Sequence, residues 1–189
     1  MTQSKHPGYE GYGSFHTPPV GRLVQEAARA GYQPPELPPR VRELTITEGI
    51  RPCQVKTRGE FEIDFETWTF LNHGAFGAAT TLALDSAAAW RRRMESQPLA
   101  FFDRELFPQL VGATYTAAKT LGAGVERTVL LPNATTGLNA ILDNVPLDEG
   151  DIIFLLDTAY GSVKKMVDHV ARQHGATVHM HPVRLEALG

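Results

Sequence analysis

Two threonine hydroxyls and one amide side chain stand close together at residues 133–136, where the sequence is Asn-Ala-Thr-Thr. The short β-branched run before Pro132 predicts a strand over 128–131. The apolar spacing after Thr136 predicts a helix. Backbone N–H groups at a helix start have no intrahelical acceptor, and the macrodipole is positive there, so a phosphate fits this place. The simpler interpretation is that Asn133 or Thr135 only caps the helix.

A second group that could do chemistry is the turn at 71–77, Leu-Asn-His-Gly-Ala-Phe-Gly. Its two glycines let the backbone approach a ligand closely, and its histidine and asparagine carry polar atoms that could contact that ligand. An ordinary loop, with a histidine satisfied by the protein itself, explains the pattern equally well.

The C-terminal residues predict the framework that would position these groups. Residues 152–156 are a continuous apolar run, which is typical of a strand buried on both faces. A helix capped by Ser162 and ended by Gly175 should follow, and then a strand over 177–183. Strand, helix, strand in this order implies parallel pairing and right-handed crossovers. Ligands bind beyond the carboxyl ends of such strands, where both 133–136 and the loop after residue 156 would lie.

Two helices are predicted ahead of this framework. The first runs from Thr80 or Thr81 to about Met94, and the second from Pro108 to the glycine at 122. The first helix should bury one face, made of Ala83, Ala87, Trp90 and Met94.

The N-terminal residues have a different composition. Residues 1–60 are rich in glycine and proline, and only 20–30 could hold a short helix. Apolar and acidic residues then alternate from residue 61, which suggests a short strand or an extended edge over 61–71. The predicted organisation is a largely irregular arm, 1–60, followed by one α/β unit, 61–189.

Composition narrows the classes of function. The chain has 189 residues and a formal net charge of −3, so it gives no reason to expect nucleic-acid or anionic-membrane binding. Its single cysteine, Cys53, excludes an internal disulfide and suits a reducing compartment. With no apolar run of membrane-spanning length, we expect a soluble, cytoplasmic protein, and we predict no metal site.

Several segments, taken in order, resemble the isopenicillin N epimerase-like branch of the class V aminotransferases, which are fold-type I enzymes dependent on pyridoxal 5′-phosphate. The resemblance covers about 65–182. It implies part of a three-layer large domain with parallel strands and crossover helices, acting on an amino acid by transamination, epimerisation or C–S lysis. The matching segments are 70–77, 104–106 within a Phe-rich run, 132–139, Gly150-Asp151 and Tyr160-Gly161.

The resemblance also assigns roles to residues. Tyr160 matches the aromatic position that stacks on the pyridine ring, which is histidine in several relatives; a tyrosine stacks as well but does not carry protons near neutrality. Relatives often have His-Glu just before it, where this chain has Thr-Ala. The residues implied to hold the cofactor phosphate are Ala134, Thr135 and Thr136. Those matching the segment on the substrate side of the cofactor are Asn72, His73 and Gly74.

The family also needs a Schiff-base lysine, and an aspartate on the pyridine nitrogen, from strands later in the large domain. We predict that all the lysines of this chain are solvated: Lys5, Lys56, Lys119, Lys164 and Lys165. The chain is therefore expected to be the N-terminal portion of such an enzyme, inactive alone and a homodimer when full length. The alternative is a catalytically silent fragment or pseudoenzyme that associates with a full-length partner. A Rossmann-like nucleotide binder is a weaker hypothesis, because no Gly-x-Gly-x-x-Gly follows the first strand.

Overall fold

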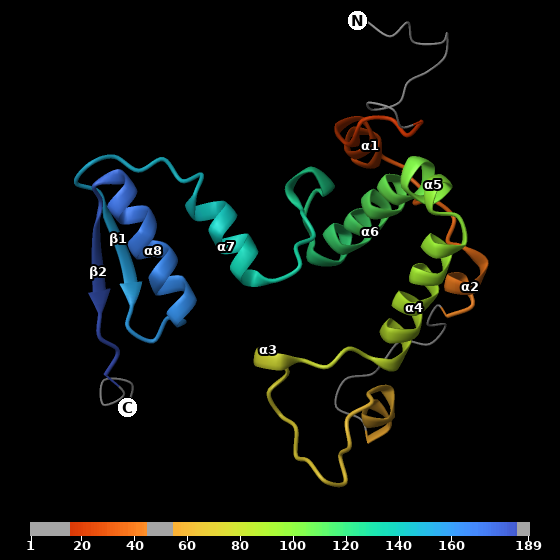
Figure 1. Ribbon diagram of the computed structural model, residues 1–189, viewed down its shortest axis with the longest axis horizontal. Helices are drawn as coiled ribbons and strands as arrows, with labels where there is room; N and C mark the ends of the chain where they lie inside the picture. The colour runs from red at the N-terminus through yellow and green to blue at the C-terminus, as the bar shows by residue number, and fades with distance from the viewer. Residues whose placement is uncertain (1–15, 45–54, 185–189) are drawn as a thin grey trace, which may run out of the picture. The chain divides into compact units, whose positions relative to one another are not determined.

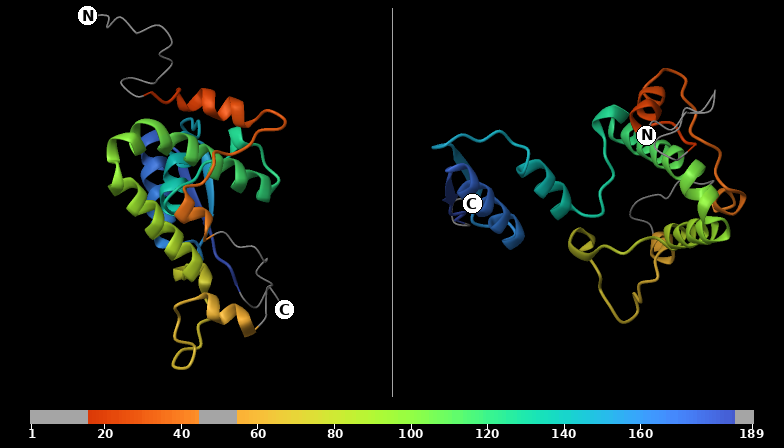
Figure 2. Two further views of the ribbon diagram at one scale, coloured as in Figure 1. Left: turned by 90° about the vertical axis from the view of Figure 1, so that its right-hand side faces the viewer. Right: turned by 45° about the horizontal axis from the view of Figure 1, so that its top comes forward.

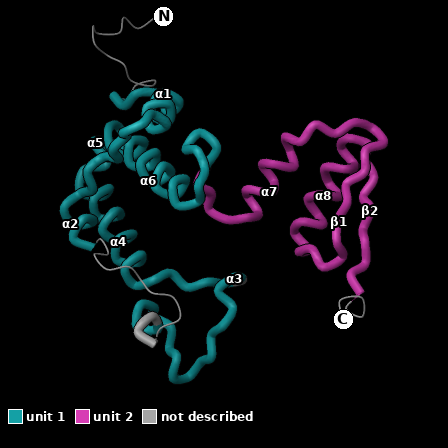
Figure 3. The backbone as a smooth tube through the Cα atoms, turned by 180° about the vertical axis from the view of Figure 1, so that it is seen from behind, with its two compact units in different colours: residues 1–128 teal, residues 129–189 magenta. Residues whose placement is uncertain are grey.

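The computed structural model describes residues 16–44 and 55–184 (Figure 1). The chain divides into two compact units, Met1–Thr128 and Val129–Gly189, shown in separate colours in Figure 3, and each is described by itself. Lys5 and Cys53 lie outside the described residues, as does the side chain of Lys56. Within the described ranges, no helix is both long enough and apolar enough to cross a membrane.

The first unit is mainly helical. Its elements are α1 (Val20–Ala27), α2 (Pro39–Arg42), the 3-10 helix η1 (Val55–Glu60), α3 (His73–Phe76), α4 (Thr81–Ser96), α5 (Pro98–Ala100), the π-helix η2 (Phe101–Glu105), α6 (Leu106–Leu121) and the 3-10 helix η3 (Val125–Arg127). The second unit contains α7 (Ala134–Leu142), β1 (Ile152–Leu156), α8 (Gly161–His174) and β2 (Thr177–His181).

Helix α4 confirms the predicted helix, but its buried face differs. Thr80 is the N-cap, and its Oγ1 accepts a hydrogen bond from the N–H of Ala83 at 3.3 Å. Ala83 and Ala87 are exposed, whereas Ala89 is buried beside Val41 of the contacting helix α2. The predicted face was therefore wrong at these two alanines. An alanine-rich helix offers several similar apolar stripes, and the segment that packs against it selects one of them.

The second predicted helix begins before Pro108, the residue at which the sequence predicts its start. Helix α5 starts at Pro98 and leads through η2 directly into α6, so Pro108 lies in the first turn of α6 rather than at its start. The predicted end is confirmed, because Gly122 is the C-cap with a left-handed φ of 68°.

Part of the proline-rich N-terminal segment packs against α6. Figure 2 shows α1 beside α6, and the two helices are in contact. A Cβ atom at Gly112 would lie 3.0 Å from Pro35 Cδ and 3.3 Å from Pro34 Cβ, so glycine permits this close approach. The core of the first unit thus forms between α1, α6 and η3, from Ala27, Val111, Ala118 and Val125.

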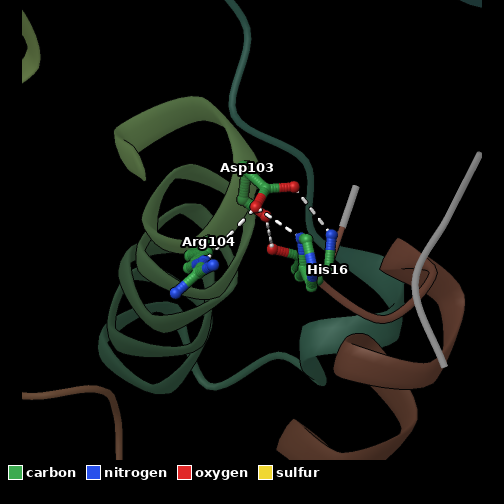
Figure 4. Close-up of polar contacts among 4 residues, drawn as sticks. His16, Asp103 and Arg104 are labelled. Atoms are coloured by element: carbon green, nitrogen blue, oxygen red, sulfur yellow. Dashed lines mark hydrogen bonds and ion pairs between the residues drawn. The ribbon is translucent and has the colours of Figure 1, made fainter. Parts of the chain in front are cut away.

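A buried carboxylate in the π-helix η2 fixes the chain that leads into α1 (Figure 4). Asp103 Oδ1 accepts a hydrogen bond from the His16 backbone N–H at 2.7 Å, and Asp103 Oδ2 lies 2.7 Å from His16 Nδ1. Arg104 Nε donates to the same Oδ2 at 3.3 Å. The Thr17 N–H and hydroxyl both donate to the Asp103 carbonyl oxygen. The His16 backbone N–H, the His16 ring and Arg104 favour the ionised carboxylate, so they lower the pKa of Asp103 below its ordinary value of 3.8.

The lowered pKa makes the anchoring of residues 16 and 17 pH-dependent. A carboxyl group with a depressed folded-state pKa stabilises the fold above its unfolded pKa, and this stabilisation is lost as the pH falls through the folded value. Asp103→Asn keeps the shape but removes the charge. We therefore expect wild type to be more stable than Asp103→Asn near neutral pH, with a difference that shrinks below about pH 4. Urea unfolding of both proteins at a series of pH values measures this difference, and a gap that does not vary with pH would contradict the assignment.

The second unit confirms most of the predicted C-terminal framework. Strands β1 and β2 pair in parallel, with Ile152 opposite Thr177 and Leu156 opposite His181. Helix α8 connects them and contacts both strands. It ends at Gly175, whose φ is 68°. The strand predicted over 177–183 is present but ends at His181.

Three further sequence predictions differ from the structure. The segment 128–131 is not a strand: Thr128 is half-buried and the next three residues are exposed. In the described residues the sheet contains only β1 and β2, and a strand requires a hydrogen-bonded neighbour. In 61–71 only an isolated antiparallel bridge forms, between Phe61 and Thr80. Ser162 does not cap α8; Tyr160 is the N-cap, and it makes no side-chain capping bond.

Candidate functional site

The first turn of α7 is organised by Asn133. This residue is the N-cap, and its Oδ1 accepts hydrogen bonds from the Thr136 backbone N–H at 2.8 Å and the Thr136 hydroxyl at 3.0 Å. The N–H of Gly137 donates to the Asn133 carbonyl oxygen at 3.3 Å. The capping interpretation is therefore correct for Asn133, and the cap occupies both hydrogen-bond donors of Thr136.

Other donors at the same turn remain available to a ligand. The backbone N–H groups of Ala134 and Thr135 are the first two of the helix, and no acceptor in the described residues bonds them. The Thr135 hydroxyl likewise makes no hydrogen bond there, and both residues are exposed. Three donors at the positive end of the helix macrodipole can bind an anion with several acceptor oxygens, such as phosphate.

An aromatic ring stands at the start of the neighbouring helix. Tyr160, the N-cap of α8, is 75% exposed. It ends the loop after β1, which is held at its other end by Asp157. The Asp157 N–H donates to the His181 carbonyl oxygen at 3.0 Å, and Asp157 Oδ1 accepts from the Val183 N–H at 3.0 Å. The hydrogen bonds of Asp157 therefore fix the start of the loop, and the exposed Tyr160 side chain lies at its end.

The fold of the second unit brings these two helix starts to one end. Helices α7 and α8 are in contact. In Figures 1 and 3 both run in the same direction, and both begin at the end of the unit toward which β1 and β2 point. Ala134, Thr135, Thr136 and Tyr160 therefore belong to the carboxyl end of the parallel strands, where ligands bind in such sheets.

The predicted substrate-side residues lie in the first unit. Asn72 precedes α3, while His73 and Gly74 form its first two positions. The His73 ring is exposed and packs against Phe61 and Phe70, with ring centroids 5.2 Å and 4.7 Å away. The turn requires a glycine at its end, since a Cβ on Gly77 would lie 2.5 Å from the His73 carbonyl oxygen. A role toward substrate stays a prediction for these residues.

Lys164 is not the solvated lysine that the sequence suggested. It is half-buried, and its Nζ donates a hydrogen bond of 2.5 Å to the Asp157 carbonyl oxygen. Lys119 and Lys165 are exposed, as predicted. One signal could have identified Lys164: it follows Tyr160 by four residues, so its side chain lies above the first turn of α8 and can reach the preceding strand end.

Comparisons with known proteins agree with the resemblance read from the motifs. No family model matches the chain. Putative L-cysteine desulfhydrase 1 of Oryza sativa subsp. japonica is 33% identical over 129 residues, which cover 64% of this chain and 27% of that protein. Isopenicillin N epimerase of Streptomyces clavuligerus is 28% identical over 120 residues, covering 64% of this chain and 30% of that protein.

A solved structure of C-DES with glycine covalently linked to its pyridoxal phosphate cofactor also matches. The TM-score is 0.52 at 24% identity, over 57% of this chain and 28% of that one. The chain thus spans less than a third of the length of each of these proteins. These findings confirm the resemblance to isopenicillin N epimerases and the predicted fold class, a part of the fold-type I large domain.

Proposed function

We propose that this homologue of L-cysteine desulfhydrases and isopenicillin N epimerases binds pyridoxal 5′-phosphate at the carboxyl end of its parallel strands. The cofactor phosphate would be held by the N–H groups of Ala134 and Thr135 and by the Thr135 hydroxyl, and the Tyr160 ring would stack on the pyridine. One observation carries the proposal: unbonded donors and an exposed aromatic side chain stand at the starts of two contacting helices.

The chemistry of these groups fits the cofactor. A phosphate dianion accepts hydrogen bonds from the donors that a helix start leaves unused, and the positive end of the macrodipole favours its charge. A tyrosine face supports an aromatic ring by stacking. Thr136, also predicted to bind the phosphate, would contribute less, because both of its donors bond Asn133.

For the whole protein we propose an enzyme that acts on an amino acid by transamination, epimerisation or C–S lysis. When bound, pyridoxal phosphate acts as an electron sink for carbanions formed from an amino acid. Asn72, His73 and Gly74 would contact the substrate, and the active enzyme would be a cytoplasmic homodimer. The names of the desulfhydrase and epimerase relatives support the amino-acid substrate class.

The test uses pyridoxine 5′-phosphate and pyridoxine, because neither carries the aldehyde that reacts with surface lysines. Titration calorimetry on the full chain should show that the phosphorylated compound binds about tenfold or more tightly, since hydrogen bonds to a charged group contribute about 1.5–3 kcal/mol. Inorganic phosphate should compete with it. Equal binding of the two compounds, or no binding of either, would overturn the proposal.

The second candidate, a catalytically silent chain that associates with a protein partner, is favoured by one observation. Ile152, Phe154 and Leu156 alternate along β1 and are 69%, 61% and 43% exposed, on the face away from α8. A partner covering this apolar row would bury it. Sedimentation velocity over a range of concentrations tests association. Association of the chain without binding of pyridoxine 5′-phosphate supports the second candidate, and binding of that compound, by monomer or dimer, supports the first.

A further inference from the structure

The side chain of Lys164 bridges the first turn of α8 and the carboxyl end of β1. Its backbone N–H donates to the Tyr160 carbonyl oxygen at 3.1 Å, as expected in a helix, while its Nζ reaches back to the Asp157 carbonyl oxygen. Both ends of the loop 157–160 are therefore bonded to one residue. The side chain of the neighbouring Lys165 is exposed and makes no hydrogen bond or ion pair in the described residues.

This position is electrostatically unusual for a lysine. The first turn of a helix favours anions, because the macrodipole is positive there. A lysine that followed solvation alone would extend into water, as long charged side chains generally do. Lys164 is instead half-buried, and its ammonium group donates a hydrogen bond to the carbonyl oxygen of Asp157, just past the end of β1.

Asp157 is the fixed point to which Lys164 is attached. Its N–H bonds the end of β2, its carboxylate accepts from the Val183 N–H, and its carbonyl oxygen accepts from Lys164. The N–H of Ala159 also returns to the Leu156 carbonyl oxygen at 3.1 Å, which closes the turn inside the loop. Tyr160 is the last residue of this loop, and its side chain makes no capping hydrogen bond at the start of α8.

We propose that Lys164 is a positioning residue for Tyr160: by bonding the Asp157 carbonyl oxygen it fixes the loop 157–160, so that the tyrosine ring is already placed when the cofactor pyridine arrives. This inference rests on the proposed function. Fixing the ring beforehand removes the ordering that binding would otherwise require, which strengthens binding without any contact between Lys164 and the ligand.

The experiment compares Lys164→Met, Lys164→Arg and the matched control Lys165→Met, each with and without Tyr160→Ala. Pyridoxine 5′-phosphate is titrated into the full chain by calorimetry, and hydrogen exchange of the amides in 157–161 is measured without ligand. Circular dichroism confirms that each variant is folded.

Lys164→Met should weaken binding about three- to tenfold, the effect expected when one side chain must be ordered on binding. It should also speed amide exchange in the loop. Lys164→Arg keeps a cation and hydrogen-bond donors and should restore most of the affinity, and Lys165→Met should bind as wild type does. In the Tyr160→Ala background, Lys164→Met should have no further effect, because its influence passes through the ring.

Two results would overturn the positioning role while leaving the proposed function intact. One is wild-type affinity in Lys164→Met. The other is an equal loss in the Tyr160→Ala background, which would mean that Lys164 attracts the phosphate directly. Failure of the wild-type chain to bind pyridoxine 5′-phosphate is a different result, and it overturns the proposed function itself.

Discussion

A chain carrying Thr135→Val is expected to bind pyridoxine 5′-phosphate about 10- to 100-fold more weakly than wild type, because a hydrogen bond to a charged group contributes about 1.5–3 kcal/mol. Valine keeps the β-branched shape and removes only the hydroxyl. That hydroxyl has no partner in the described residues, so its loss should affect ligand binding far more than stability. Titration calorimetry measures the affinity, and thermal unfolding checks the fold.

Thr136→Val provides the informative comparison. Its hydroxyl already donates to Asn133 Oδ1, so we expect a smaller loss of affinity than for Thr135→Val. Thr120→Val is the matched control in another helix, because its hydroxyl donates only to the Thr116 carbonyl oxygen in α6. A larger loss for Thr136→Val than for Thr135→Val would contradict the assignment of the donors.

Val170→Asp is expected to unfold the second unit. Val170 lies in α8, is 2% exposed, and belongs to the helix that packs against β1, β2 and α7. An unpaired charge buried at this position carries a penalty of several kcal/mol, which is a large part of the stability of a typical domain. The measurement is amide hydrogen exchange in β1 and β2, which should lose protection.

The matched control for Val170→Asp is His169→Asp, at the adjacent and exposed position of the same helix. It introduces the same aspartate side chain one residue earlier in the helix, at a position exposed to solvent. The amides of β1 and β2 should therefore stay protected from hydrogen exchange. Equal protection in both variants would show that α8 does not hold the second unit together.

The clearest sequence predictions concern elements whose signal is local. Helix α8 and strand β1 are predictable because a helical apolar period and a continuous apolar run differ clearly at these lengths. Glycines at 122 and 175 mark helix ends because both adopt a left-handed φ of 68°. The Asn133 cap also follows from its immediate neighbours.

The predictions that differ from the structure concern segments whose contacts are with residues distant in the sequence. Residues 128–131 have a strand-like composition, but strand formation requires a neighbouring chain that composition does not specify. The bonds from residues 16 and 17 to Asp103 join segments more than eighty residues apart, and no local pattern indicates them. Lys164 was missed because its helical spacing indicated a solvated face, whereas its long side chain turns back to the end of β1.

The proposed site places the phosphate of pyridoxal 5′-phosphate at the first turn of α7, beside the Tyr160 ring. Nuclear magnetic resonance of the full chain, titrated with pyridoxine 5′-phosphate, tests it most directly. We predict large downfield shifts of the Ala134 and Thr135 amide protons, together with a ring-current shift of the Tyr160 side chain. Saturation with the ligand that leaves these signals in place, or shifts residues elsewhere, would contradict the account.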